Sequence, residues 1–325
     1  MQDERDDDLS EMGEAAEDAP RVRETPLLPG AEGRRYDLLS VGEAMLRFTP
    51  PNGLRIEQTL SLDLAVGGAE LNVAVAMSRI GGRTAWLSKL PDTSLGHILG
   101  NQARIHGVDT SHIIWTDAAD SRLGLFFLES GAVPRAGEIV YDRKSSAAST
   151  MTADDWDWAT LLRETRVLHI TGITPALSAS CRTMTFAAVA AAKKAGCAVS
   201  CDLNYRSKLW TPDEAAACLR ELLPQVDVIL TGSSDLKIIF GQAGKPAELA
   251  QWLRTEFGVP VASVGKRRGN AASGMQARRS VVATERGVFT SPGAEFQPLD
   301  PIGAGDAYGA GFLYGLLTTD DEEQA

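Results

Sequence analysis

The sequence of 325 residues lacks any run of eighteen or more apolar residues, which excludes a typical transmembrane helix. Its start lacks the basic region and apolar core of a secretory signal, so we expect a cytoplasmic protein with no membrane partner. Four cysteines without a C-x-x-C pair are too few for a disulfide framework and predict buried free thiols. Four scattered histidines without ligand spacing indicate no zinc site.

Negative charge is abundant but concentrated at the two ends of the chain, whose formal net charge is −11. Residues 1–19 carry nine acids and one arginine, and residues 320–323 add four acids. The body between them is close to neutral, which argues against a nucleic-acid partner. Because the first thirty residues are also poor in apolar groups, we predict a disordered acidic tail over 1–33 and a second acidic tail over 318–325.

The region between the tails, residues 34–317, predicts one α/β domain. After a buried strand over 36–41, strands alternate with helices from residue 166 onward, which indicates crossover connections and a mostly parallel sheet flanked by helices. The expected strands cover 166–170, 198–202, 226–230 and 259–264, and the expected helices cover 179–195, 212–223 and 247–257. Thr211, Pro212 and Glu214 have the spacing of a capped helix start.

Two stretches, 53–66 and 121–147, interrupt this alternation. They contain alternating or β-rich runs without crossover helices, so we expect a small antiparallel excursion from the main sheet. Such an excursion would form a lid over the edge of the sheet that binds ligands.

The most informative motif is the turn Gly303-Ala304-Gly305-Asp306, which precedes a small-residue apolar helix. Free amides and the positive end of a helix dipole make such a turn an anion site, and glycine permits close approach of a phosphate. Asp306 would repel a phosphate unless it accepts the proton of an attacking hydroxyl. The spacing alone leaves open whether Asp306 is that base or a helix cap.

Two competing nucleotide motifs are excluded. The glycine spacing continues as Gly305-x-x-x-Gly309, and too little chain follows for the acid of a dinucleotide fingerprint. No G-x-x-x-x-G-K-[ST] segment occurs, so a P-loop is not indicated.

The segment from Asp300 to Asp306 resembles the second signature of the PfkB carbohydrate kinases, which have a ribokinase-like fold. The segment from Gly67 to Gly82, with two glycines entering a helix, resembles the first signature of that family. The resemblance implies that Gly303, Ala304 and Gly305 form the anion hole for the transferred phosphate. It also implies that Asp306 deprotonates the acceptor hydroxyl.

The sugar side is predicted from the first signature and the lid. Gly67 and Gly68 let backbone amides reach sugar hydroxyls, and Asn72 in the first helical turn offers a donor and an acceptor, unless it is simply solvated. Tyr141 and Arg143 in the lid, with Arg206 after the strand ending at Asp202, resemble the sugar-acid contacts of 2-keto-3-deoxygluconate kinases. Phe126 replaces a second tyrosine of those kinases. Each arginine taken alone could instead form a surface ion pair.

The nucleotide side departs from the family pattern. Where the family has Asn-x-x-Glu to organise Mg²⁺, this sequence has Gly232 and Asp235, so we expect Asp235 to hold a weakened magnesium site. The resemblance places Asn204, Gly265, Lys266 and Arg268, together with Gly303 and Gly305, beside ATP. The cations near residue 266 could equally be solvated loop charge.

The length also departs, because family members continue with further helices after the Gly-Ala-Gly-Asp helix. We therefore expect an incomplete nucleotide pocket and an uncovered face at Leu313, Leu316 and Leu317. The resulting hypothesis is an ATP- and Mg²⁺-dependent kinase that phosphorylates the primary hydroxyl of a 2-keto-3-deoxy sugar acid. The alternatives are a fructokinase- or ribokinase-type kinase of a neutral sugar and a truncated homologue that binds without efficient catalysis. A homo-oligomer formed through the lid is implied by the same resemblance.

Overall fold

The computed structural model describes residues 28–131, 135–269, 275–300 and 302–319. The predicted acidic tails lie mostly outside these residues. Within the part of the first tail that is described, Leu28 is only 3% exposed and belongs to the hydrophobic core. The chain therefore contacts the body before the predicted boundary at residue 34.

The main sheet has the strand order β14-β13-β12-β11-β10-β9-β1-β4, with β15 paired to β13. Its strands are β1 (Tyr36–Val41), β4 (Thr84–Leu87), β9 (Thr165–Thr171), β10 (Ala198–Asp202), β11 (Val228–Gly232), β12 (Val261–Gly269), β13 (Gln276–Ala283), β14 (Val288–Thr290) and β15 (Ala294–Phe296). The strands from β4 to β12 in this order are parallel, and β13, β14 and β15 are antiparallel. The prediction of a mostly parallel sheet is confirmed.

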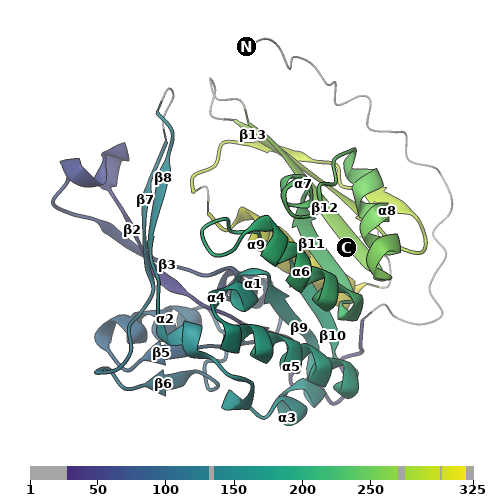
Figure 1. Ribbon diagram of the computed structural model, residues 1–325, viewed down its shortest axis with the longest axis horizontal. Helices are drawn as coiled ribbons and strands as arrows, with labels where there is room; N and C mark the ends of the chain where they lie inside the picture. The colour runs from purple at the N-terminus through teal and green to yellow at the C-terminus, as the bar shows by residue number, and fades with distance from the viewer. Residues whose placement is uncertain (1–27, 132–134, 270–274, 301, 320–325) are drawn as a thin grey trace.

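Helices cover both faces of this sheet. Figure 1 shows several of them in front of the strands, and two separate hydrophobic clusters fill the two sides. The first face carries α3 (Trp158–Arg163), α4 (Ile173–Leu177), α5 (Ala179–Ala195), α6 (Pro212–Leu222), α7 (Ser233–Phe240) and α8 (Pro246–Phe257). The second face carries α1 (Ala69–Arg79), α2 (Ser94–Ile105) and α9 (Ala304–Thr318).

The helix α9 packs directly on the sheet, which corrects one expectation. Leu313 and Leu316 are buried among core residues, and Leu317 is half-buried. The prediction of an uncovered leucine face is therefore wrong for Leu313 and Leu316, because those side chains are buried in a cluster with residues of the strands and of α1.

Local sequence signals account well for the helix ends. The predicted capping box is present at α6, where the Glu214 amide donates to the Thr211 hydroxyl at 3.3 Å and the Thr211 amide donates to the Glu214 carboxylate at 2.8 Å. The predicted bounds of α5 and β10 are confirmed as well.

A second, four-stranded sheet forms the lid, in the order β3-β2-β7-β8. Its strands are β2 (Met45–Thr49), β3 (Asp63–Gly67), β7 (Leu125–Glu129) and β8 (Glu138–Asp142). Figure 1 shows this lid standing to one side of the main sheet. The prediction of a purely antiparallel lid is wrong, because β2 pairs with β7 in parallel. The strand β2 was not predicted; it begins only four residues after β1 ends.

Register divides the lid residues into two faces. One cross-strand row contains Ala65, Arg47, Phe126 and Tyr141, and the next row, on the opposite face, contains Leu64, Phe48, Phe127 and Val140. The first row includes Phe126 and Tyr141, two of the lid residues predicted to bind substrate. The second row is entirely apolar.

The remaining elements are short connections. They are the paired strands β5 (Lys89–Pro91) and β6 (Ile114–Thr116) and the 3₁₀ turns η2 (Pro51–Gly53), η3 (Ile56–Gln58), η4 (Ala147–Thr150), η5 (Ala153–Asp155) and η6 (Leu223–Gln225). All four cysteines are free and buried, as predicted. Over the described ranges, no helix is both long and apolar enough to cross a bilayer.

Candidate active site

The turn before α9 has the geometry of an anion site. Gly303 is the N-cap of the helix and has φ +83°, a left-handed conformation that favours glycine. The first hydrogen bond of this helix joins the Ala307 amide to the Gly303 carbonyl at 2.8 Å. The amides of Ala304, Gly305 and Asp306 therefore precede the helical ladder and remain available to an anion.

Asp306 does not cap α9, so the cap interpretation is wrong. Its carboxylate accepts a hydrogen bond of 2.7 Å from Asn72 Nδ2, and α1 packs against α9. Asn72 is half-buried, which also excludes simple solvation on the helix surface. The two sequence signatures thus meet in one hydrogen bond, at the carboxyl end of the sheet.

The environment of Asp306 balances opposing effects on its proton affinity. Burial raises the pKa of Asp306 above its ordinary value, while the Asn72 hydrogen bond and the positive charge of Arg206 lower it. A base near a phosphate needs this balance, because it must be ionised before it can accept a proton.

Two further carboxylates lie near Asp306. Asp202 ends β10, and burial together with the charges of Asp306 and Asp235 raises the pKa of Asp202 to about 8, against the effect of Arg206. Asp235, in the first turn of α7, accepts the Tyr205 amide at 3.2 Å, and burial raises its pKa too. With only one exposed arginine beside three acids, burial and repulsion oppose the ionisation of all three carboxyl groups at once.

This acid cluster fits a hydrated magnesium ion bound to a nucleotide. Among the residues that the structure describes, no three His, Cys, Asp or Glu side chains converge as a metal cage. Mg²⁺ in nucleotide sites is commonly held by one or two carboxylates, phosphate oxygens and water. Asp235 and Asp202 fit that requirement. The mutual repulsion of their charges is the observation that favours a cation there.

The predicted nucleotide residues lie along neighbouring strands. Gly232 on β11 is the register partner of Gly265 on β12, so the start of α7 lies beside the predicted nucleotide turn. Asn204 has φ +40° and donates to the Asp202 carboxylate at 3.2 Å. Lys266 is half-buried, whereas the side chain of Arg268 lies outside the described residues.

A buried acid beneath the site was missed from the sequence. Glu70 is fully buried in the first turn of α1, and its Oε1 accepts 2.7 Å hydrogen bonds from the hydroxyls of Thr171 and Thr174. Burial raises its pKa, and the charge of Asp306 adds to the effect. A Cβ atom on Gly42 would lie 2.2 Å from the Glu70 carboxyl carbon, so a larger residue at position 42 would displace this carboxyl group.

The lid supplies an aromatic wall and one arginine. The Phe126 and Tyr141 rings lie 5.8 Å apart, and the Arg143 guanidinium lies 5.7 Å from the Tyr141 ring centre. Arg143 also forms an ion pair with Glu43, whose side chain is only 1% exposed. Glu43 was not predicted from the sequence. Its carboxylate partly neutralises the positive charge that Arg143 would present to a substrate.

Two glycines of the first signature allow this packing. A Cβ on Gly67 would lie 3.3 Å from Phe126, and one on Gly68 would lie 2.5 Å from the Glu43 carbonyl oxygen. The backbone after β3 therefore lies against both the aromatic wall and the connection that leads into the lid.

The lid and the strand ends are joined by Lys208. Its ammonium donates to the Ile139 carbonyl at 2.7 Å and lies 5.6 Å from the Tyr141 ring centre. Arg206, two residues earlier, is exposed and forms no ion pair with any described residue. The structure thus brings the lid side and the Arg206 side of the predicted sugar site together.

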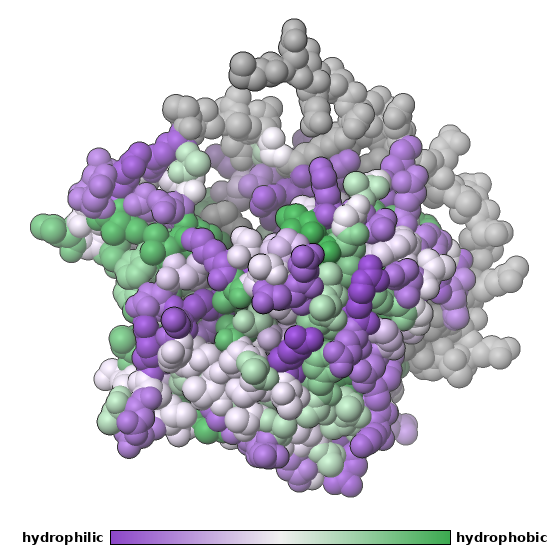
Figure 2. All heavy atoms as spheres, viewed as in Figure 1, coloured by the Kyte–Doolittle hydropathy of each residue, from purple (hydrophilic) through white to green (hydrophobic). Residues whose placement is uncertain are grey.

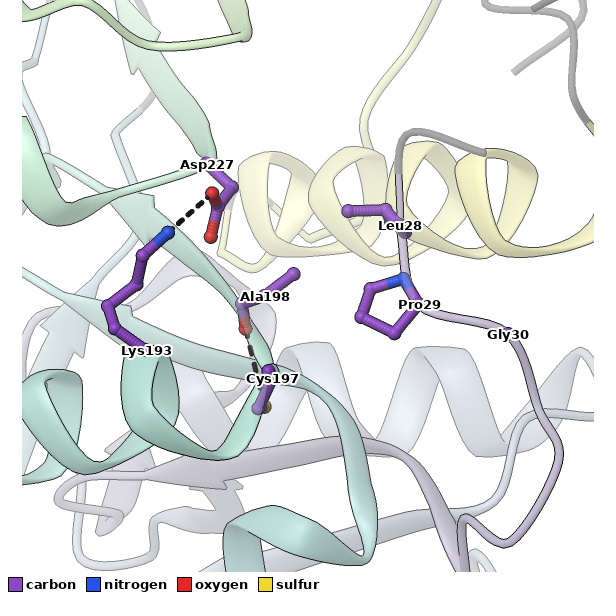
Figure 3. Close-up of a pocket in the computed structure, with 8 residues that line it drawn as sticks. Leu28, Pro29, Gly30, Lys193, Cys197, Ala198 and Asp227 are labelled. Atoms are coloured by element: carbon purple, nitrogen blue, oxygen red, sulfur yellow. Dashed lines mark hydrogen bonds and ion pairs between the residues drawn. The ribbon is translucent and has the colours of Figure 1, made fainter. Parts of the chain in front are cut away.

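A pocket on the opposite edge of the sheet is unrelated to this chemistry. Figure 3 shows Leu28, Pro29 and Gly30 on one side of this pocket, with Cys197 and Ala198, at the start of β10, on the other. Its two charged lining residues, Lys193 and Asp227, neutralise each other at 2.7 Å. We assign no site to it.

Comparison with known proteins agrees with the site geometry. The family model described as "pfkB family carbohydrate kinase" matches residues 36–325. The chain belongs to the pfkB family of carbohydrate kinases. A kinase of this family takes ATP and a small-molecule sugar as its substrates, which is consistent with an anion turn and a carboxylate side by side.

Similar proteins include sugar-acid kinases. The 2-dehydro-3-deoxygalactonokinase of Haloferax volcanii is 37% identical over 89% of this pfkB chain and 87% of its own length. The crystal structure of 2-dehydro-3-deoxygluconokinase from Thermotoga maritima has 32% identity and a TM-score of 0.83, covering 89% of this chain and 90% of that one. A fructokinase structure from Xylella fastidiosa, at 23% identity and a TM-score of 0.69 over 88% of this chain and 84% of that one, shares the fold alone.

The hydrogen bond from Asn72 should set the pH dependence of turnover. Because this donor stabilises the ionised carboxylate, Asn72→Ala raises the pKa of Asp306 further. The acidic limb of the kcat profile should therefore move to higher pH, measured with a coupled ADP assay across the acid range. Ser78→Ala on the same helix serves as the control and should leave the limb in place. An acidic limb that stays put or moves to lower pH in Asn72→Ala contradicts this prediction.

Proposed function

We propose that this pfkB kinase transfers the terminal phosphoryl group of ATP to the primary hydroxyl of a 2-keto-3-deoxy sugar acid. The observation that carries the proposal is Asp306, a half-buried carboxylate held by Asn72 beside three free amides at the start of α9. The names of the similar kinases from Haloferax volcanii and Thermotoga maritima support the choice of a sugar acid.

The chemistry follows from the two parts of the turn. Asp306 accepts the proton of the sugar hydroxyl as its oxygen bonds to the terminal phosphorus of ATP. The bond between that phosphorus and the bridging oxygen breaks, and ADP leaves with the electron pair. The amides of Ala304 and Gly305 donate to the phosphoryl oxygens, where negative charge is spread during the transfer.

Magnesium belongs to the same proposal. Asp235 and Asp202 would hold the hydrated ion against the phosphates, and the ion would supply positive charge that neutralises them. Gly265 and Lys266 on β12, with Arg268, would lie along the nucleotide. The turn at Gly303 receives the phosphoryl group that is transferred.

Recognition of the acid rests mainly on Arg206. Its guanidinium is exposed, near the catalytic carboxylates, and forms no ion pair within the described residues, so it is free to bind a substrate carboxylate. Phe126 and Tyr141 would pack against the sugar chain, while the amides near Gly67 and Gly68 would reach its hydroxyls. Arg143 contributes the donors that Glu43 leaves free.

A neutral sugar is the second candidate, and one contact favours it. The ion pair between Arg143 and Glu43 removes one of the two positive charges predicted to face the substrate. A site with a single free arginine has a weaker electrostatic preference for an acidic sugar over a neutral one.

The two candidates are separated by identifying the product. We expect ATP, Mg²⁺ and 2-keto-3-deoxygluconate or 2-keto-3-deoxygalactonate to give a new phosphomonoester in the phosphorus NMR spectrum. Its signal should be a triplet, because a primary ester couples to two protons. Fructose and ribose under the same conditions should give almost none. Preferential phosphorylation of fructose or ribose would contradict the sugar-acid proposal.

A variant at Arg206 tests whether this arginine recognises the substrate carboxylate. Arg206→Leu should lower the ratio of kcat/KM for the acid to that for a neutral sugar by roughly 10- to 100-fold, because hydrogen bonds to charged groups contribute about 1.5–3 kcal/mol. An unchanged ratio would mean that Arg206 does not bind the substrate carboxylate.

Self-association through the lid is a further part of the proposal. Figure 2 shows hydrophobic residues gathered over the lid strands, and the apolar row includes Leu64 and Val140, which are 46% and 44% exposed. In that row the Phe48 and Phe127 rings stack at 5.4 Å. Two such faces from two copies would bury each other.

Light scattering tests this association. The wild-type chain should have the mass of a dimer or larger oligomer, and Leu64→Glu combined with Val140→Glu should give a monomer. A monomeric wild type excludes association through the lid.

A cytoplasmic location is proposed as well, since all four cysteines are free thiols and ATP is the donor.

A further inference from the structure

Arg47 on β2 is a charged residue in the row of lid residues that faces the site. Its register partners are Ala65 on β3 and Phe126 on β7, and Phe126 is in turn the partner of Tyr141. Arg47 therefore lies beside the proposed aromatic wall of the sugar site. Its neighbours in the sequence are apolar, so no local charge pattern explains it.

The partner of Arg47 belongs to the phosphate turn. Arg47 Nη2 lies 2.6 Å from the carboxylate of Asp300, and the same carboxylate accepts the Ile302 amide at 2.9 Å. Ile302 directly precedes Gly303, the N-cap of α9. Burial opposes ionisation of Asp300, but the hydrogen bonds from Arg47 and Ile302 outweigh it and lower its pKa. Asp300 thus connects a lid strand to the segment that forms the anion site.

We propose that Arg47 is a positioning residue that, through Asp300, holds the turn at Gly303 in its anion-binding conformation while the lid lies over the site. The inference rests on the proposed function, since it gives the lid a role in phosphoryl transfer. In this role Arg47 acts through Asp300 and not by direct contact with substrate or phosphate. It orients the backbone amides that donate to the phosphoryl group.

An ordinary surface ion pair would not have this role, because exposed pairs contribute little. The Arg47 side chain is only 17% exposed, and its Nε is buried without a partner among the described residues. By contrast, Arg122 and Asp142 also form a 2.6 Å pair, but their side chains are 41% and 52% exposed and both belong to the lid. Lys208 joins the lid to the body through Ile139 without reaching the turn.

The kinetic test compares Arg47→Met, Arg47→Lys, Asp300→Asn and the double variant Arg47→Met/Asp300→Asn in the full chain. Arg47→Met should lower kcat by about tenfold to a hundredfold, since small misplacements of catalytic groups cost rate, with a much smaller change in sugar KM. Arg47→Lys should recover part of the loss. The double variant should be no worse than the poorer single variant, because both changes break one connection.

The matched control is Arg122→Met, which removes a lid ion pair of the same length away from the turn and should leave kcat at the wild-type value. The second readout is hydrogen exchange of the Ile302 amide, which donates to Asp300, without substrates. It should accelerate in Arg47→Met and stay unchanged in Arg122→Met. This measurement does not depend on the identity of the sugar, so a wrong substrate assignment leaves it interpretable.

Three results would overturn the proposal: unchanged exchange in Arg47→Met, wild-type kcat in an active Arg47→Met enzyme, or losses in the single variants that simply multiply in the double variant. If the wild type phosphorylates no sugar acid, the proposed substrate fails. The exchange experiment then decides on Arg47 alone.

Discussion

The hydrogen bond between Asn72 and Asp306 is the contact on which the site depends, because it joins two residues that lie 234 positions apart in the sequence. It fixes the first turn of α1 against the first turn of α9. The free amides of one helix and the polar side chain of the other then face the same point at the carboxyl end of a parallel sheet. Ligands bind at this edge in open α/β sheets, since the helix N-termini and strand ends converge there.

Charge is the second constraint, and it explains why the site requires its ligands. Asp202, Asp235 and Asp306 lie close enough together that the charges of Asp306 and Asp235 add to burial in raising the pKa of Asp202, and burial raises the pKa values of Asp235 and Asp306. Arg206 offsets part of this repulsion. A magnesium ion with its nucleotide would offset more, and Asp306 would remain the proposed base. Glu70, buried below, adds a fourth carboxyl that the surrounding threonines hold in place.

Much of the fold followed from local sequence signals. The alternation of strands and helices after residue 166, and the capping box at Thr211, depend on neighbours only and were predicted correctly. The strand β2 was missed because it follows β1 after a three-residue connection, without a turn signal of its own. The burial of Leu313 and Leu316 depends on how α9 packs on the sheet, which the helix sequence alone does not reveal.

Only the site residues that belong to sequence motifs could be predicted from the sequence. The family signatures pointed to Asp306, Asn72 and the glycine turn, and the structure brings these together. Spacing could not show that Glu43 pairs with Arg143, or that Arg47 pairs with Asp300, since each pair joins segments that are distant in sequence. Such contacts create a site of specific charge and shape, and they arise only when the folded lid contacts the body of the protein. The predicted roles of Asn204, Lys266 and Asp235 toward the nucleotide remain proposals.

The most direct test of the account is the turnover of Asp306→Asn. This change keeps the size of the side chain and removes its ability to accept a proton. We expect kcat to fall by about 10²- to 10⁴-fold, the usual contribution of a general base, while the melting temperature and calorimetric binding of the sugar acid stay near the wild-type values. A folded Asp306→Asn enzyme that keeps wild-type kcat would contradict the assignment of Asp306 as the base.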